Sequence, residues 1–193
     1  MNRISLEEIV KQAEQENRSL PELMKERESL ETGLPIEEIT KTMDQMYDVM
    51  LEGYHQGVES DNRSVSGLTG GEGWRLMNYV KDKKTTGLYA KAAARAMGVS
   101  NINASMGRIV ATPTAGSCGI LPGSLITLAE EYGISRKDVV DSLFISAYIG
   151  KVIADNASIS GAEGGCQAEC GSAAAMAAGA GVYLCGGDRK SVV

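Results

Sequence analysis

The sequence predicts an all-α fold. Apolar residues recur every three or four positions in several stretches, which is the period of an amphipathic helix. Strand signals are nearly absent, because apolar and polar residues show no sustained alternation and β-branched runs are few. The chain also has a single Phe among its 193 residues. Together these observations favour helices throughout.

The N-terminal third is predicted to consist of helices. Ser5 and Glu8 have the spacing of a capping box, so we expect a first helix from about residue 6 to residue 17. Pro21 suits the first turn of a second helix, because proline lacks the N–H that a first turn leaves unpaired. A third helix is expected over residues 35–59, where the apolar positions keep a helical period.

Three further helices are predicted in the rest of the chain. Residues 88–97, LYAKAAARAM, have high helix propensity, and we expect this helix to stop at Gly98. Ser135 and Asp138 form a second possible capping box, ahead of the helix with the widest apolar face in the chain. After Cys170 the sequence is small and apolar, which indicates a tightly packed helix.

The chain changes character near residue 60. Residues 1–60 are acidic and helical in pattern, so we expect them to form an N-terminal helical arm or lobe. Residues 61–187 are rich in Gly, Ala and Ser, and we expect them to form the main domain.

Charge and composition exclude several classes of function. The net charge is −6, which argues against nucleic-acid binding because a phosphate backbone attracts clustered Lys and Arg. No uncharged apolar stretch is long enough for a membrane span, and the charged N-terminus does not fit a secretory signal. An acidic cytoplasmic enzyme with reduced thiols is therefore expected, without a nucleic-acid or membrane partner.

Two Gly-rich segments carry the thiols of interest. Cys166 and Cys170 lie in SISGAEGGCQAEC, residues 158–170, and Cys118 lies in ATPTAGSCGILPG. Backbone without bulky side chains lets a ligand approach closely, so these segments point to a cofactor site. The C-x3-C spacing would place Cys166 and Cys170 on one face of a helix.

The residues favour one kind of metal centre over others. A structural zinc site lacks its second pair of ligands, and the single His, His55, has no context for a Cys-His nucleophile. A thiolate-held iron-sulfur cluster remains, and an iron free of Cys could act as a Lewis acid. Any of the thiols could instead be a small buried hydrophobe, which is our interpretation of Cys185.

A third Gly-rich run, SGLTGGEGWRL at residues 66–76, precedes the helix that carries the only Trp. Its backbone N–H groups could cradle an anion such as a carboxylate. It lacks the ending of a phosphate loop, so a flexible connection is an equal alternative.

These motifs resemble a known family. NASMGRIVATPTAGSCGILPG (103–123) and NASISGAEGGCQAECGSAAAMAA (156–178) closely resemble the alpha chain of the iron-sulfur-dependent L-serine dehydratases, also called L-serine ammonia-lyases. SGLTGGEGWRL resembles the segment that opens the family's catalytic part, and the similarity runs over about residues 6–184. The resemblance implies a largely helical, oxygen-sensitive 4Fe-4S lyase that converts L-serine to pyruvate and ammonia. It also implies a cytoplasmic role in amino-acid catabolism and gluconeogenesis, and a separate beta subunit as partner.

The resemblance also assigns the thiols. The Cys of its GCQ motif is a metal ligand and corresponds to Cys166, while Cys118 and Cys170 are then neighbours of the cluster. The family's other two ligands lie in a downstream Cys-Asp-Pro to Pro-Cys stretch that this chain does not contain. We therefore expect a C-terminally truncated alpha chain, inactive by itself, with 61–187 as a partial catalytic domain. Residues 188–193 are interpreted as an artefactual tail.

The same resemblance suggests substrate contacts. Residues proposed to bind the carboxylate and ammonium of serine are Thr112, Thr114, Ser117, Asn156, Ser158 and Ser160. The catalytic base stays open, with Lys151, Glu163 and Glu169 as candidates. For Lys151 we favour solvation of the end of its helix over a catalytic role.

Two other functions stay open. The chain could belong to a related iron-sulfur lyase that acts on cysteine or threonine. It could also be a cluster-free scaffold that is naturally short.

Overall fold

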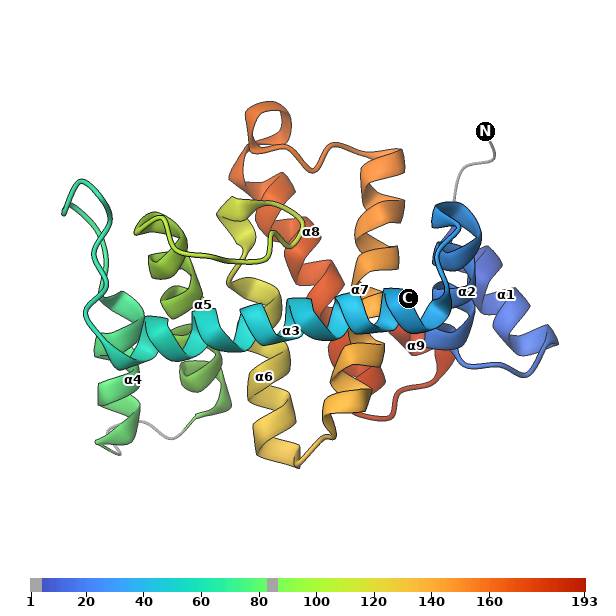
Figure 1. Cartoon of the computed structure of the whole chain (residues 1–193), viewed down its shortest axis with the longest axis horizontal. Helices are drawn as coiled ribbons and strands as arrows, with labels where there is room; N and C mark the ends of the chain where they lie inside the picture. Colours follow the sequence, from blue (N-terminus) through green and yellow to red (C-terminus); the bar gives the residue numbers. More distant parts are fainter. Residues whose placement is uncertain (1–4, 83–86) are drawn as a thin grey trace. The chain divides into compact units, whose positions relative to one another are not determined.

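The computed structural model describes residues 5–82 and 87–193, and these residues are mostly helical (Figure 1). No β-strand occurs in these two stretches, and one isolated antiparallel bridge pairs Arg63 with Gly70. The all-α prediction is confirmed. In chain order the helices are α1 Leu6–Gln15, α2 Leu20–Thr32, α3 Ile36–Glu59, α4 Glu72–Lys81, α5 Leu88–Ala104, the 3-10 turn η1 Ala115–Ser117, α6 Ile120–Tyr132, α7 Arg136–Asn156, α8 Gly161–Leu184 and α9 Arg189–Val192.

The chain divides into two compact units. The first combines the described residues up to Gln45 with Ile134–Val193, and the second comprises the described part of Met46–Gly133. This division differs from the sequence-based boundary at residue 60, because the N-terminal helices pack with the C-terminal ones. Helix α2 contacts α7, and α1 contacts α9.

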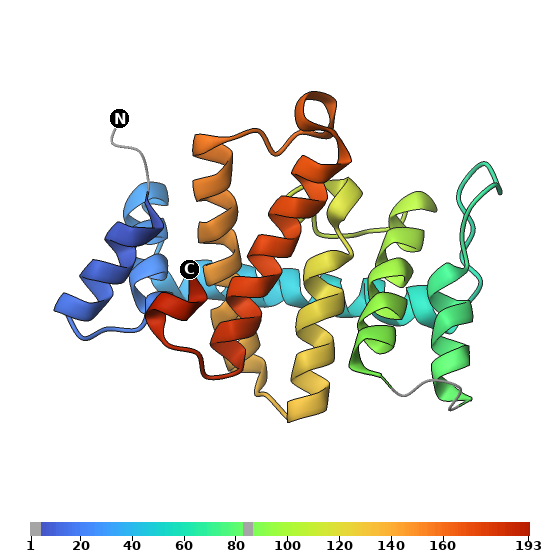
Figure 2. The same cartoon turned by 180° about the vertical axis from the view of Figure 1, so that it is seen from behind.

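The first unit is built on the antiparallel neighbours α7 and α8, which lie side by side in Figure 2. Apolar residues of α7 recur at helical spacing, as the sequence predicts, and become the centre of the core. Ala173 and Ala180 of α8 are fully buried, so small side chains let the two helices lie close together. Buried large residues of α7 are Val139, Val140, Leu143, Phe144, Ile145, Tyr148 and Ile149.

A charged cluster joins α2 to α7 inside this unit. Asp141 is 8% exposed, and its two carboxylate oxygens accept from Lys25 and from Lys137, the latter at 2.7 Å. The Lys25 ammonium also lies 5.1 Å from the centre of the Phe144 ring. Burial raises the pKa of Asp141, but the hydrogen bonds from Lys137 and Lys25 outweigh it and hold that pKa below its usual range.

The second unit depends on a close meeting of three helices at Gly98. A Cβ atom at Gly57 of α3 would lie 2.2 Å from the Gly98 carbonyl, and one at Gly73 of α4 would lie 2.3 Å from the Gly98 nitrogen. The prediction that the helix stops at Gly98 is therefore wrong, since α5 continues to Ala104. Gly98 marks the point where neighbouring backbones touch rather than a helix end.

The helix caps match the sequence in part. The first helix is predicted to reach residue 17 but ends at Gln15, and Ser5 occupies the N-cap without a side-chain hydrogen bond. The predicted cap at Ser135 is confirmed, because its Oγ accepts from the Asp138 N–H at 3.2 Å. Ser19 and Glu22 form a complete capping box on α2 that the sequence analysis missed.

Across residues 5–82 and 87–193, no helix combines the length and the apolar composition needed to cross a bilayer.

Replacing Asp141 with Asn should lower the free energy of unfolding by about 1–3 kcal/mol at neutral pH, because Lys25 loses a partly buried partner. The lowered pKa of Asp141 means that its contribution exists above the unfolded pKa and is lost as pH falls through the folded pKa. Urea unfolding of both proteins should therefore show a difference that is full at pH 6 and shrinks below about pH 4. A difference that stays constant down to pH 3 would contradict this account.

Replacing Gly57 with Ala should lower the free energy of unfolding by about 1–3 kcal/mol, since its methyl group has no room against the Gly98 backbone. Gly53 lies one turn earlier on α3, and a Cβ there meets only ordinary contacts from 3.9 Å. Gly53→Ala is therefore the matched control and should be neutral or stabilising by up to about 1 kcal/mol. Equal losses in the two variants, measured by urea unfolding, would refute the close contact.

Candidate functional site

Most of the Gly-rich segment that contains Cys166 and Cys170, residues 158–170, is helical. The connection between α7 and α8 spans only residues 157–160, because α8 begins at Gly161. Ser160 is the N-cap residue, and its Oγ accepts from the Ala162 N–H at 3.2 Å. Its carbonyl accepts from the N–H groups of Glu163 and Gly164, so the first turn of α8 is closed.

Three of the predicted site residues meet at this helix start. Ser158 donates from its Oγ to the Glu163 carboxylate at 2.6 Å and accepts from the Ser160 N–H at 3.2 Å. A carboxylate at a helix N-terminus is also favoured by the helix dipole. Asn156, at the end of α7, donates from Nδ2 to the Val152 carbonyl at 2.8 Å. Ser158, Ser160 and Glu163 therefore form one polar network.

Helix α8 is broken at Gly165, directly before the first thiol. Gly165 has φ 71° and ψ −177°, a backbone conformation that is essentially restricted to glycine. A Cβ there would have only one neighbour, 3.9 Å away, so the constraint is the backbone angle and not the space. The break separates the first turn from a continuous helical segment that starts at Cys166, as the path of α8 in Figure 1 shows.

Cys166 and Cys170 lie on consecutive turns after this break. Their Sγ atoms are 3.6 Å apart, which confirms that the C-x3-C spacing puts both thiols on one helix face. Cys166 is exposed and Cys170 is half-buried. The hydrogen bond with Cys166, together with burial, raises the pKa of Cys170.

The other two thiols belong to different surroundings. Cys118 is 1% exposed, and burial raises its pKa to about 11, so it stays protonated near neutral pH. Cys185 is exposed at the end of α8, so its interpretation as a small buried hydrophobe is wrong. Helix α8 ends at Leu184, and the chain turns away there without covering this side chain.

The donor set does not complete a site for a four-iron cluster. Such clusters are held by several thiolates, and Cys166 and Cys170 supply two sulfur atoms at most. In the part of the chain that the structure describes, no three Cys, His, Asp or Glu side chains are grouped so that they could hold a metal ion. These residues by themselves therefore do not fit the cluster.

The three candidate bases have different partners. Glu163 accepts from Ser158. The Glu169 carboxylate lies against Gly161, where an added Cβ would come within 2.6 Å of its Oε2. Lys151, on α7, forms an ion pair with Glu31 of the α2 helix. The two carboxylates therefore lie at the first turn of α8, whereas Lys151 is engaged with α2.

The second predicted group of anchors lies in the other unit, at residues 112–118. The Ser117 hydroxyl donates to the Thr112 carbonyl at 3.0 Å and shares a hydrogen bond of 3.2 Å with the Thr114 hydroxyl. Thr112 donates to the Cys118 carbonyl at 3.5 Å, and its peptide bond to Pro113 is cis. The hydroxyls of Thr114 and Ser117 are brought together, whereas that of Thr112 is bonded to the backbone of the same loop; Thr112 and Ser117 are buried.

In the Gly-rich run at residues 66–76, backbone N–H groups are hydrogen-bonded to side chains of the protein itself. The Gly70 N–H donates to Glu72 and the Gly73 N–H donates to Asn101, each at 3.2 Å. Asn101 also donates to the Glu72 carboxylate at 2.8 Å. Hydrogen bonds from its own backbone N–H and from Asn101 lower the pKa of Glu72. The carboxylate that this run cradles is therefore the protein's own.

The sequence analysis did not identify the buried guanidinium of Arg95. Arg95 is 5% exposed and donates to Thr127 at 2.6 Å and to Glu130, with the Tyr54 ring 4.9 Å from its guanidinium carbon. Its Nε has no hydrogen-bond partner among the described residues. The available signal was a lone Arg inside the Ala-rich stretch AKAAARAM, where the neighbouring residues are small enough to bury it.

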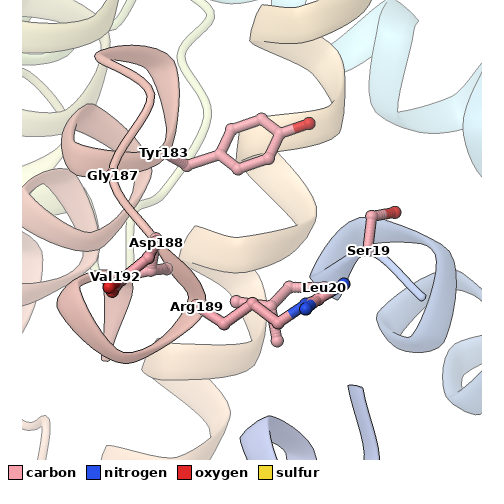
Figure 3. Close-up of a pocket in the computed structure, with 7 residues that line it drawn as sticks. All are labelled: Ser19, Leu20, Tyr183, Gly187, Asp188, Arg189 and Val192. Atoms are coloured by element: carbon pink, nitrogen blue, oxygen red, sulfur yellow. The ribbon is translucent and has the colours of Figure 1, made fainter. Parts of the chain in front are cut away.

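The C-terminal residues line a cavity of about 280 Å³ in the first unit (Figure 3). Its walls come from the start of α2, the end of α8 and α9, and they are mainly apolar. Arg189 donates from Nε to the Arg18 carbonyl at 3.0 Å, and Val192 is 4% exposed. The lining residues are Ser19, Leu20, Tyr183, Gly187, Asp188, Arg189 and Val192. The cavity contains no predicted site residue, and the artefactual origin of 188–193 stays a prediction.

Comparison with known proteins identifies similar chains. The family described as serine dehydratase alpha chain matches residues 7–193. The "Probable L-serine dehydratase, alpha chain" of Bacillus subtilis (strain 168) is 38% identical over 96% of this chain and 62% of its own length. The "L-serine dehydratase, alpha chain" of Peptoniphilus asaccharolyticus is also 38% identical, over 96% of this chain and 64% of its own. The "L-serine dehydratase" of Helicobacter pylori (strain J99 / ATCC 700824) is 33% identical over 98% and 43%.

The chain is shorter than these relatives. It spans somewhat under two thirds of the first two and less than half of the third.

Replacing Gly165 with Ala should lower the free energy of unfolding by about 1–3 kcal/mol, because the break in α8 requires a backbone angle that alanine avoids. Gly171→Ala is the matched control in the same helix, since a Cβ there meets nothing within 4 Å. The control should be neutral or stabilising by up to about 1 kcal/mol. Urea unfolding measures both, and similar values for the two variants would show that α8 has no break at Gly165.

Proposed function

Because the chain belongs to the serine dehydratase alpha-chain family, we propose that it works in the elimination of water from L-serine, which yields pyruvate and ammonia. The observation that carries this proposal is the family match over residues 7–193. The matched residues include the two Gly-rich segments that carry Cys118 and Cys166. The names of the Bacillus and Peptoniphilus relatives contain "alpha chain", which supports a separate beta chain as partner.

The reaction makes two chemical demands. The α-proton of serine is a weak acid and hydroxide is a poor leaving group, so a base at the α-carbon and assistance at the hydroxyl are both required. Loss of the α-proton and of the hydroxyl gives aminoacrylate and water. Aminoacrylate rearranges to an imine, and water hydrolyses the imine to pyruvate and ammonium, so no atom is left over.

The start of α8 has carboxylates that could serve as the base for the α-proton. Glu163 and Glu169 place two carboxylates at one helix turn, and Ser158 fixes the position of Glu163 by a hydrogen bond of 2.6 Å. Lys151 would first have to leave its ion pair with Glu31. We therefore propose Glu163 or Glu169 as the base ahead of Lys151.

Hydroxyl and amide groups would orient the substrate. Ser158 and Ser160, with Asn156 at the end of α7, are the proposed anchors at the α7–α8 loop. Thr112, Thr114 and Ser117 are the proposed anchors of the second unit. Because Thr112 and Ser117 are buried and hydrogen-bonded within their loop, they would act mainly by holding the backbone of that loop in position.

The proposed cofactor is a 4Fe-4S cluster, for which this chain supplies one ligand, Cys166. Its exposed thiol at the start of a helical segment supports that role. The described residues do not complete the cluster site.

Co-expression of the beta chain with an alpha chain that includes the downstream Cys-Asp-Pro to Pro-Cys stretch, without oxygen and with iron and sulfide, tests the proposal. We expect pyruvate to form with L-serine, measured by coupled oxidation of NADH, and L-threonine and L-cysteine serve as competing substrates. Cys166→Ser should reduce the rate to the background without enzyme, because a thiolate ligand is lost.

Cys185→Ser is the matched control, because Cys185 is also exposed but lies outside the proposed site. It should keep the full rate. An active Cys166→Ser protein, or no pyruvate from serine in a folded complex, would overturn the proposal.

A further inference from the structure

The two thiols of α8 are close enough to react with each other. Their Sγ atoms are 3.6 Å apart, and a disulfide bond requires about 2.0 Å. The sulfur atoms therefore have to approach by about 1.6 Å. Cys166 is exposed, so a small reagent in solution can reach it, and Cys170 is half-buried beside it.

The backbone of α8 can shift at Cys166 so that the two sulfur atoms come within bonding distance. Residues four apart in a helix have Cβ atoms about 5–6 Å apart, which is longer than the 3.5–4.5 Å of a disulfide. A rigid helix would resist the closure. Here Gly165 breaks α8 directly before Cys166, so Cys166 is held by helical backbone on one side only. At Gly171, directly after Cys170, an added Cβ would meet nothing within 4 Å.

We propose that Cys166 and Cys170 form a dithiol that a low-molecular-weight disulfide oxidises to a bond within α8. In the first step the Cys166 thiolate attacks one sulfur of the reagent, forming a mixed disulfide and releasing one reagent thiol. In the second step the Cys170 thiolate attacks Cys166 Sγ, forming the protein disulfide and releasing the second thiol. Two protein thiols lose two electrons and two protons, and one reagent disulfide becomes two thiols.

The bond would act on the proposed function. Cys166 is the thiolate that we propose as a cluster ligand, so a closed disulfide removes that ligand until a thiol reduces it again. This consequence rests on the proposed function. The disulfide itself does not, because its formation needs neither iron, beta chain nor serine.

The test treats the reduced, metal-free chain with an excess of oxidised glutathione and maps each cysteine by intact mass and peptide mass. The pair should lose about 2 Da and keep no glutathione. Cys185, exposed without a neighbouring thiol in the described structure, should gain one adduct of about 305 Da. Cys118 is buried and should stay a free thiol, which reports that the chain remains folded.

Cys170→Ala is the decisive variant, since Cys166 then lacks its resolving thiol. Its Cys166 should accumulate the glutathione adduct at least about tenfold more than in the unsubstituted chain, because the intramolecular step is lost. Cys185→Ser should remove the single adduct and leave the 2 Da loss unchanged. Circular dichroism confirms that both variants keep their helix content.

Three results would overturn the proposal. Stable adducts on both Cys166 and Cys170 would show that the second step does not occur. Two unreacted thiols beside a modified Cys185 would show that the pair is not accessible. Disulfide-linked dimers through Cys166 would show that its partner is another chain.

Discussion

Three helices of the second unit meet where one backbone lies directly against another, and only glycine leaves room for such a contact. In the second unit, α3 and α4 both reach the α5 backbone at Gly98 through Gly57 and Gly73. Dispersion contacts between backbones at this distance depend on a missing side chain, so each glycine sets the separation of its helix from the next. The positions of α4, α5 and the 112–118 segment that follows α5 depend on this contact.

The same use of small residues produces the candidate site in the first unit. Ala173 and Ala180 bring α8 close to α7, and Gly165 interrupts α8 one residue before Cys166. A helix without this break would hold Cys166 in continuous hydrogen-bonded backbone. With it, the thiol lies at the beginning of a helical segment, exposed to solvent and 3.6 Å from a second thiol.

In two segments where the sequence indicated a ligand site, the polar side chains form hydrogen bonds within the chain itself. The Gly-rich run before α4 holds Glu72, and the hydroxyls of Thr112, Thr114 and Ser117 bond to one another or to their own loop. Such internal bonds fix a loop in one conformation, which is what a binding segment needs before its ligand arrives. The proposed anchors Thr112, Thr114 and Ser117 are therefore better understood as groups that hold their loop in one conformation than as free hydroxyls.

Much of the helical content could be predicted, because amphipathic spacing and N-cap residues are local signals. The α7 core face and the cap at Ser135 follow from them. The helix through Gly98 could not be predicted, since local propensity treats a glycine as a stop and only the neighbouring backbones show why it is needed. Buried Arg95 was missed for a related reason, because its partners Tyr54, Thr127 and Glu130 come from other helices.

The sequence by itself determined the helical class, the motifs that tie the chain to its family, and the C-x3-C spacing that puts two thiols on one face. These depend on residue type and on the period of the helix. The tertiary structure decided that α8 starts at Gly161 and breaks at Gly165, and that the N-terminal helices pack with the C-terminal ones. It also decided which thiols are exposed, because burial depends on residues far away in the chain.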